Sequence, residues 1–156
     1  MNPRIRRLQS DHQKVMSAFA NHPRIRIVEV AGTPPEKYIV ELSVRSLIPD
    51  GDSGVREGTT HRAEIFLSLD YPRRPPFCRM MTPVYHPNID PQKICIGDHW
   101  SAGQGLPMLL VRIAEMLTYQ SYNTKSPLNG QAAAWAEQNE DKLPLEQVDL
   151  SAGCLG

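Results

Sequence analysis

The chain is most constrained by a short stretch, 85–95, in which two prolines stand among polar and reactive side chains. Pro87 and Pro91 fix the backbone φ and remove two amide donors, so this stretch cannot run as a regular helix or as a central strand. It must form a stiff, shaped loop that holds a thiol, an amide and an imidazole at fixed relative positions, as reactive side chains require. These side chains are those of Cys95, Asn88 and His86.

Length and charge limit the classes of protein to which this chain can belong. With 156 residues the chain is most simply one domain, 1–156, in which 140–156 is a weakly patterned tail. Basic and acidic residues number 17 each, which argues against nucleic acid and anionic membranes as partners. No apolar run approaches the roughly 20 residues of a membrane span. The three cysteines, an odd and widely spaced set, favour a reducing compartment, so we expect a cytoplasmic protein without a structural disulfide.

Hydrophobic spacing predicts an α+β fold. An N-terminal helix with apolar residues three and four apart precedes runs in which apolar and polar residues alternate, as in strands with one buried face. The prediction is an N-terminal helix, a four-stranded antiparallel meander, an active-site loop, a core helix and a short C-terminal helix. The expected helices cover 3–21, 107–122 and 131–139, the expected strands cover 25–31, 38–47, 61–69 and 77–81, and 49–58 is expected to be a loop.

An ordered set of short motifs runs along most of the chain. The set is Tyr71-Pro72-x-x-Pro75-Pro76, His86-Pro87-Asn88, Ile94-Cys95, Trp100-Ser101 and Pro127-Leu128-Asn129 before an alanine-rich helix. In order and approximate spacing it resembles the catalytic domain of ubiquitin-conjugating enzymes, from the first helix to about Asn139. Any one tripeptide would be weak evidence, whereas the ordered set is specific.

The resemblance implies an acyl transferase with no cofactor and no metal. Cys95 would receive a ubiquitin-like modifier from an activating enzyme as a thioester and pass it to a lysine amine of a target protein. The amide of Asn88 would donate to the oxyanion of that transfer or hold the loop in shape, and Ser126 would either orient the amine or cap the turn before Pro127. The residues that would shape the active loop are Tyr85, His86, Pro87 and Asp98.

Several positions depart from the family pattern. The spacing from Asn88 to Cys95 is one residue shorter than usual, and Arg73 stands where the family commonly has a ligase-contacting phenylalanine. Binding of ordinary RING or HECT ligases is therefore not expected, and the divergence fits a dedicated modifier and activating enzyme, as in a prokaryotic conjugation system. Arginines also crowd the first turn of the first helix, where the helix dipole disfavours cations. These residues, Arg4, Arg6 and Arg7, form either a solvated face or, together with Arg73, a partner-binding patch.

Three other functions fit parts of the pattern. A cysteine hydrolase would use Cys95 with His86 and Asn88. A catalytically inert member of the same fold would be a binding module for ubiquitin-like proteins, although such variants lack the thiol present here. A zinc site would combine His86 and Cys95 with His99 and needs a fourth ligand or water.

Overall fold

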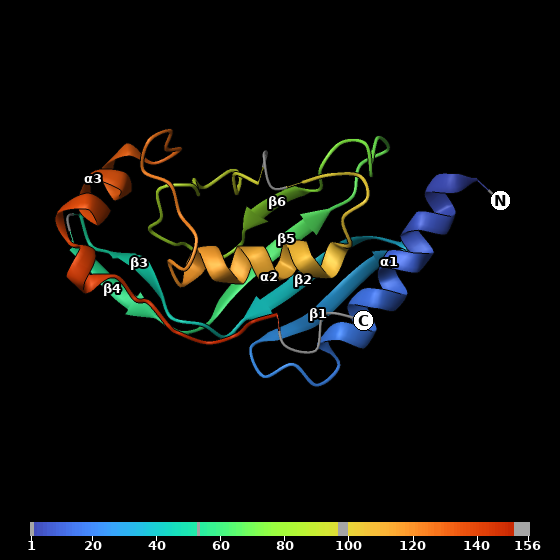
Figure 1. Cartoon of the computed structure of the whole chain (residues 1–156), viewed down its shortest axis with the longest axis horizontal. Helices are drawn as coiled ribbons and strands as arrows, with labels where there is room; N and C mark the ends of the chain where they lie inside the picture. Colours follow the sequence, from blue (N-terminus) through green and yellow to red (C-terminus); the bar gives the residue numbers. More distant parts are fainter. Residues whose placement is uncertain (1, 53, 97–99, 152–156) are drawn as a thin grey trace.

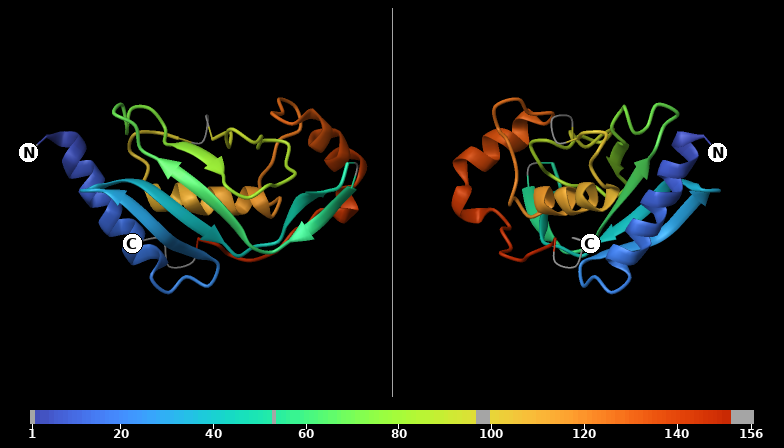
Figure 2. Two further views of the ribbon diagram at one scale, coloured as in Figure 1. Left: turned by 180° about the vertical axis from the view of Figure 1, so that it is seen from behind. Right: turned by 45° about the vertical axis from the view of Figure 1, so that its right-hand side comes forward.

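The computed structural model describes residues 2–52, 54–96 and 100–151, arranged around a four-stranded antiparallel sheet (Figure 1). One helix flanks the sheet at one end and a second covers one face (Figure 1, Figure 2). A small hairpin and a third helix lie at the other end (Figure 1). The elements in chain order are α1 (Pro3–Phe19), β1 (Ile25–Gly32), β2 (Pro35–Leu42), β3 (Ser46–Asp50), β4 (Gly54–Gly58), β5 (His61–Phe66), β6 (Phe77–Met80), α2 (Leu106–Leu117), α3 (Gly130–Gln138) and the 3-10 turn η2 (Glu140–Lys142).

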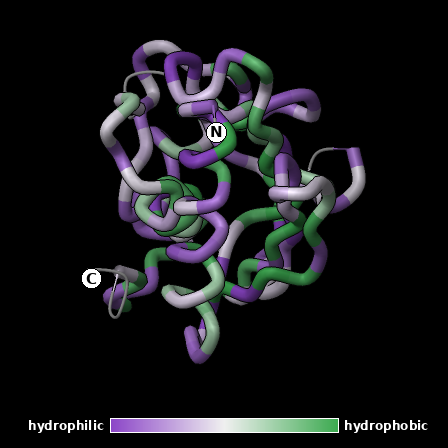
Figure 3. Tube along the Cα trace, turned by 90° about the vertical axis from the view of Figure 1, so that its right-hand side faces the viewer, coloured by the Kyte–Doolittle hydropathy of each residue, from purple (hydrophilic) through white to green (hydrophobic). Residues whose placement is uncertain are grey.

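The predicted four-stranded meander is confirmed. Its strand order is β1-β2-β5-β6, and each neighbouring pair is antiparallel. Alternation along the strands sends every second side chain to the buried face of the sheet, where Tyr38, Val40 and Ile65 are fully buried and Tyr38 contacts His12 of α1. Figure 3, viewed along the long axis, shows hydrophilic and hydrophobic residues interleaved along the chain.

The predictions of one strand over 38–47 and a loop over 49–58 were wrong. The chain leaves the main sheet after β2, and β3 pairs with β4 in a separate two-stranded sheet. At the break, the Arg45 amide donates to Oε1 of Glu146 at 2.6 Å, across 101 positions of sequence. The hairpin then turns through Gly51, whose φ of 71° lies in the left-handed region that glycine adopts without steric cost.

The helices begin where the sequence predicts and end slightly earlier. Asn2 caps α1 by accepting a hydrogen bond from the Ile5 amide at 2.9 Å, and Asn129 caps α3 in the same way. α2 is buried along most of its length against the sheet. It ends at Leu117 rather than near residue 122, because Tyr119 turns into the left-handed region with a φ of 60°.

The stretch after η2 runs back along the sheet towards β1 (Figure 1). Leu150 is buried, and its carbonyl lies 2.9 Å from Nε2 of His22. Glu146 forms an ion pair with Arg24 at 2.9 Å besides its bond to the Arg45 amide. Weak sequence patterning therefore does not prevent the last described residues from packing on the sheet. Within the described ranges, no helix is long and apolar enough to cross a membrane.

Candidate active site

The loop predicted to carry function is tied to three distant parts of the chain. The Tyr85 amide donates to the Leu47 carbonyl at 2.7 Å, and the Tyr85 carbonyl accepts from the hydroxyl of Tyr119 at 2.7 Å. The Pro87 carbonyl accepts from the amides of Leu128 and Asn129 at 2.8 and 3.0 Å. The loop is thus braced by β3, by the end of α2 and by the start of α3, which leaves its backbone little freedom.

His86 is fully buried beneath this loop. Its Nδ1 accepts a hydrogen bond from the Asn88 amide at 3.0 Å, and its ring packs edge-on against Tyr119 at a centroid distance of 4.7 Å. Among the described residues Nε2 has no hydrogen-bond partner, although the Met116 carbonyl lies close enough to the ring to act on its pKa. Burial lowers the pKa of His86 to about 3, against a smaller opposing effect of that carbonyl. The imidazole is therefore neutral at physiological pH and shapes the turn.

Asn88 joins the active loop to the stretch that follows α2. Its Nδ2 donates to the Asn123 carbonyl at 2.8 Å, and its Oδ1 accepts from the Asn123 amide at 2.9 Å. Its own carbonyl accepts from the Cys95 amide at 2.9 Å. Asn88 is only 8% exposed, so its two side-chain bonds are shielded from water. The bond to the Asn123 carbonyl uses one of the two Nδ2 hydrogens, so the other can be donated to a further acceptor.

The chain between Asn88 and the thiol is a compact turn. Oδ1 of Asp90 accepts from the amides of Gln92 and Lys93 at 2.7 and 2.9 Å, and the Asp90 amide donates to the Lys93 carbonyl at 3.0 Å. An aspartate that bonds its own backbone in this way fixes a turn without glycine. The Ile94 amide then donates to the Cys78 carbonyl at 2.8 Å, which attaches the stretch to β6.

The two described cysteines lie in opposite environments. Cys95 is exposed, on the rim of an open groove of about 410 Å³. Cys78 is buried on β6, and burial raises the pKa of its thiol well above the ordinary value. Of these two thiols, that of Cys95 is the one within reach of a large partner. Cys154 lies outside the described residues, as does Asp98, which was predicted to shape the active loop.

Ser126 is exposed in the loop that precedes α3. Within 2–52, 54–96 and 100–151, no hydrogen bond involves its side chain. The neighbouring Leu128 amide is the group that bonds to the active loop, at the Pro87 carbonyl. The structure thus brings the Ser126 loop to the active loop, while the hydroxyl itself has no bonded neighbour in the described part of the chain.

Two of the four arginines predicted to bind partners have intramolecular roles. Arg7 donates to Asp11 at 2.8 Å and to the Gln104 carbonyl at 2.7 Å, and it lies over the Tyr71 ring at 5.3 Å. Arg4 donates to the Leu67 and Ser68 carbonyls at 3.1 and 3.0 Å. Both guanidinium groups therefore fasten α1 to nearby loops, and their role as partner contacts stays a prediction. Arg6 and Arg73 are exposed.

Sequence patterns did not reveal two residues that build this site. Asn123 contributes through its backbone amide and carbonyl, which any residue would supply, so no sequence signal marks it. Tyr119 supports both Tyr85 and His86, and its hydrophobic neighbours in α2 made it look like one more helical residue. A residue forced to a positive φ by such contacts cannot be identified from helical spacing alone.

Comparison with known proteins decides the family. The model of the ubiquitin-conjugating enzyme family matches residues 7–147. The chain belongs to the ubiquitin-conjugating enzyme family. It is 35% identical over 88 residues to ubiquitin-conjugating enzyme E2 N of Macaca fascicularis, an alignment that spans 54% of this chain and 57% of that protein. The chain therefore aligns with little more than half the length of this curated relative.

Solved structures show the same fold. A Plasmodium yoelii protein assigned to the ubiquitin-conjugating enzymes superposes with a TM-score of 0.63 at 20% identity, over 90% of this chain and 88% of that one. The E2 domain of a Toxoplasma gondii ubiquitin-conjugating enzyme superposes with a TM-score of 0.59 at 20% identity, over 85% and 88%. The α+β arrangement of α1, the sheet and the later helices is that of ubiquitin-conjugating enzymes.

The geometry bears on two of the rival interpretations. A cysteine hydrolase needs a base within hydrogen-bonding reach of its thiol, whereas the buried His86 bonds to the Asn88 amide and is hard to protonate. A zinc site needs several ligands that converge, and within the described ranges no group of three or more histidine, cysteine or acidic side chains does so. His99, the third ligand of that hypothesis, lies outside those ranges.

Proposed function

We propose that this member of the ubiquitin-conjugating enzyme family carries a ubiquitin-like modifier as a thioester on Cys95 and transfers it to a lysine of a target protein. The observation that carries the proposal is the contrast between the exposed Cys95, on a loop braced from three sides, and the buried Cys78. A nucleophile that exchanges acyl groups with another protein must be reachable and must stay in one place.

The proposed reaction consists of two acyl exchanges, and each forms one bond to the acyl carbon and breaks one. In the first, the Cys95 thiolate attacks the carbonyl carbon of a thioester on the activating enzyme, a new carbon–sulfur bond forms, and the activating enzyme's thiolate leaves. In the second, a neutral lysine amine attacks the Cys95 thioester, a carbon–nitrogen bond forms, and the Cys95 thiolate leaves. The amine loses its proton to solvent. Neither exchange uses a cofactor, and neither requires His86 as a base.

Two other residues have roles in the second exchange. Asn88 holds the active loop through Asn123, and its remaining Nδ2 hydrogen is available to the oxyanion that forms as the amine attacks. A lysine amine has an ordinary pKa near 10.4, so keeping it neutral at pH 7.4 costs about 4 kcal/mol. Ser126 orients that amine by hydrogen bonding, and an acid at the same position assists more because a carboxylate can accept the proton that the attacking amine loses.

The proposed partners follow from the same scheme: a ubiquitin-like modifier, its activating enzyme and a target protein. Arg6 on α1 and Arg73 in the loop after Tyr71 are exposed cations and are the proposed partner contacts. We place the protein in the cytoplasm, where cysteines stay reduced. The arginine at position 73 argues against ordinary RING or HECT ligases as helpers.

The test is charging in vitro. The protein is incubated with ATP, candidate activating enzymes and ubiquitin-like modifiers, and adducts are measured by mass with and without reductant. The wild type should gain one modifier through a reductant-sensitive bond, Cys95→Ser should form a reductant-resistant oxyester or none, and Cys78→Ala should charge normally. Normal charging of Cys95→Ala would refute the assignment. Modifier binding without any adduct would support the alternative of a non-catalytic binding module.

A further inference from the structure

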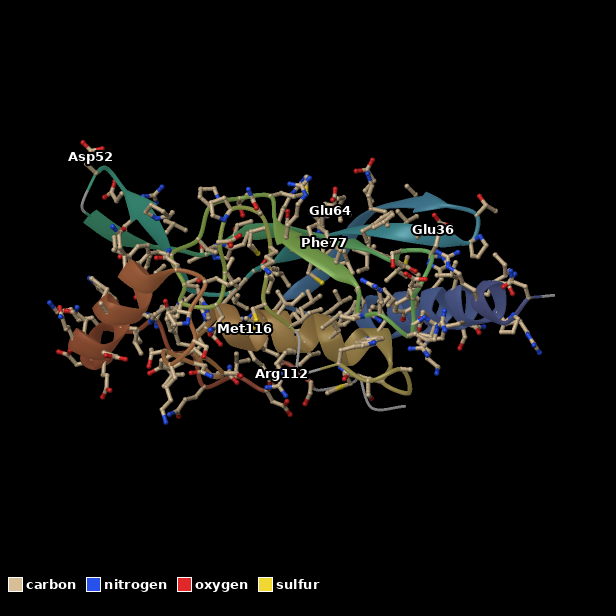
Figure 4. The ribbon with its side chains drawn as sticks, turned by 90° about the horizontal axis from the view of Figure 1, so that it is seen from above. Glu36, Asp52, Glu64, Phe77, Arg112 and Met116 are labelled. Carbon is tan, nitrogen blue, oxygen red and sulfur yellow. The ribbon has the colours of Figure 1, made fainter. Side chains whose placement is uncertain are left out.

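One cationic side chain stands beside Cys95 and has no role in the scheme above. It is Lys93, which lines the same open groove as Phe77 and Cys95. Figure 4 shows Phe77 in the sheet layer, whereas Met116 lies in the α2 layer. The groove is therefore formed on the sheet side of the active loop, whereas the side chain of Asn88 bonds to the stretch after α2.

Backbone alternation turns Lys93 and Cys95 to the same side of the chain. Ile94, between them, is 3% exposed, and its amide donates to the Cys78 carbonyl at 2.8 Å, so its side chain faces the core. In an extended stretch the residues on either side point the opposite way, and Lys93 and Cys95 are both exposed. An ammonium group and the thiol thus leave the backbone in parallel, from Cα atoms about 7 Å apart.

The backbone of Lys93 is fixed, and its charge is not compensated by an acid. Its amide donates to Oδ1 of Asp90 at 2.9 Å, and its carbonyl accepts from the Asp90 amide at 3.0 Å. Among the residues that the structure describes, no acidic side chain forms an ion pair with Lys93. Arg74, the other cation of the groove, pairs with Asp70 at 3.3 Å. Lys93 is therefore the cation that is free to meet a negative charge at Cys95.

A negative charge develops beside Cys95 in the second proposed exchange. When an amine attacks the thioester carbon, the carbonyl electron pair moves to the oxygen and forms an oxyanion. The pair then returns, the carbon–sulfur bond breaks and the Cys95 thiolate leaves. A lysine side chain reaches about 6 Å from its Cα, so an ammonium that leans towards Cys95 reaches the oxygen of an acyl group bound there.

We propose that Lys93 is a catalytic residue whose ammonium group donates a hydrogen bond to the oxyanion at Cys95. It acts from the sheet side of the active loop, and Asn88 acts from the side of the stretch after α2. Lys93 keeps its proton throughout, and the attacking amine loses its own proton to solvent. This inference rests on the proposed function. Because Lys93 is exposed, water and salt limit the gain to about five-fold in rate.

The test measures acyl transfer from Cys95 without the modifier. In the full chain with Cys154→Ser, the Cys95 thiol is acylated by exchange with an excess of an acetylglycine thioester, which releases its own thiol. The excess is removed, hydroxylamine is added at pH 7, and the loss of the acyl group is followed by intact mass. Hydroxylamine is uncharged at this pH, so Lys93 does not attract or repel it. Lys93→Met should transfer about five-fold more slowly than the parent.

Two matched variants separate charge from shape. Lys93→Arg keeps the cation and should stay within about two-fold of the parent rate, whereas Lys142→Met removes a lysine from the exposed η2 turn and should change nothing. At about 1 M salt the deficit of Lys93→Met should shrink, because the Debye length falls to about 3 Å.

Three results would overturn the inference. The first is equal rates for Lys93→Met and the parent, and the second is an Lys93→Arg variant as slow as Lys93→Met, which would assign shape rather than charge to the residue. The third is an acyl group that resists hydroxylamine and maps to Lys93, because the lysine would then be a neutral nucleophile and not a donor. The assay needs neither modifier nor activating enzyme, so these results are distinguishable from a failure of charging.

Discussion

Replacing Asn88 with alanine removes two hydrogen bonds that join the active loop to the stretch after α2. They connect its side chain to the Asn123 carbonyl and amide at 2.8 and 2.9 Å, and Asn88 is 8% exposed. Each such bond contributes about 1 kcal/mol net to folding. We therefore expect Asn88→Ala to lower the free energy of unfolding by about 2 kcal/mol. With a urea dependence of about 2 kcal/mol per molar, the unfolding midpoint should fall by about 1 M.

Asn123→Ala is the matched control for this measurement. It removes the asparagine side chain of the residue to which Asn88 bonds, yet it keeps the backbone amide and carbonyl that form those two bonds. It loses only an exposed bond from the Lys125 amide to Oδ1 of Asn123, so its stability should change by about 0.5 kcal/mol or less. Equal unfolding midpoints for Asn88→Ala and the wild type would refute the view that Asn88 holds the loop.

The same variant separates the two roles of the Asn88 amide. If the amide serves only the oxyanion, charging and stability stay normal while transfer to free lysine slows by about 10² to 10³, equivalent to about 2.7 to 4 kcal/mol. If it holds the loop, charging and stability should both fall. The two bonds to Asn123 favour a contribution from the second effect. Unchanged transfer from a purified thioester would count against both roles.

Three further changes test other parts of the structure. Ser126→Asp should speed single-turnover transfer to free lysine, and Ser126→Ala should slow it only modestly, because a hydroxyl orients an amine without removing its proton. Arg7→Ala should lower the free energy of unfolding by about 2 to 3 kcal/mol in a denaturant titration, since it leaves the buried Asp11 carboxylate without its cation. Glu146→Gln should lower stability at pH 7, and the difference should shrink as the pH falls below about 4.5, measured by thermal unfolding across pH.

Each of these changes has its own control or contrary outcome. Identical transfer rates for the wild type and both Ser126 variants would leave Ser126 a turn residue only. Arg6→Ala, one position from Arg7 and exposed, should change stability by less than about 0.5 kcal/mol, and equal losses for Arg6 and Arg7 would contradict the network.

The pH prediction for Glu146 follows from the sign of its shift. Partial burial alone would raise the pKa of Glu146, but the hydrogen bonds from the Arg45 amide and from Arg24 outweigh it and the pKa is lowered. A lowered carboxyl pKa stabilises the fold above the ordinary value of 4.5, and this stabilisation is lost as the pH falls towards the lowered value. A difference between wild type and Glu146→Gln that does not depend on pH would contradict this account.

Sequence patterns predicted the helices and strands whose formation depends on residues close to one another in the sequence. The alternation in β2 and β5 is visible because one face of each strand is buried, and α1 begins at an asparagine cap followed by proline. The β3–β4 hairpin was missed because β4 is half-buried at most and its sequence is polar, like a loop. At the break between β2 and β3 the Arg45 amide bonds to Glu146, and this contact spans too much of the sequence for a local pattern to reveal it.

The candidate site likewise has residues that sequence patterns locate and contacts that depend on distant parts of the chain. Prolines and motif order located Cys95, His86 and Asn88 in one loop, and the structure places them there. No sequence pattern could foresee that Arg7 would donate to the Gln104 carbonyl, because that contact forms only when α1 packs against the loop before α2. The pair of Arg7 with Asp11, four positions along the same helix, has a spacing that the sequence does show. An arginine at the start of a helix has the same local signature whether it is solvated, bound to a partner or locked inside the fold.

His86 and Cys95 show why closeness in sequence is a poor guide to shared chemistry. A histidine nine positions from a cysteine suggests a base and its nucleophile, but one side chain is fully buried and the other is exposed. His86 bonds to the Asn88 amide, and the Asn88 carbonyl bonds to the Cys95 amide. The imidazole therefore acts on the thiol only through the backbone between them, as a positioning residue. His86 is therefore not placed to activate water against the thioester that we propose on Cys95.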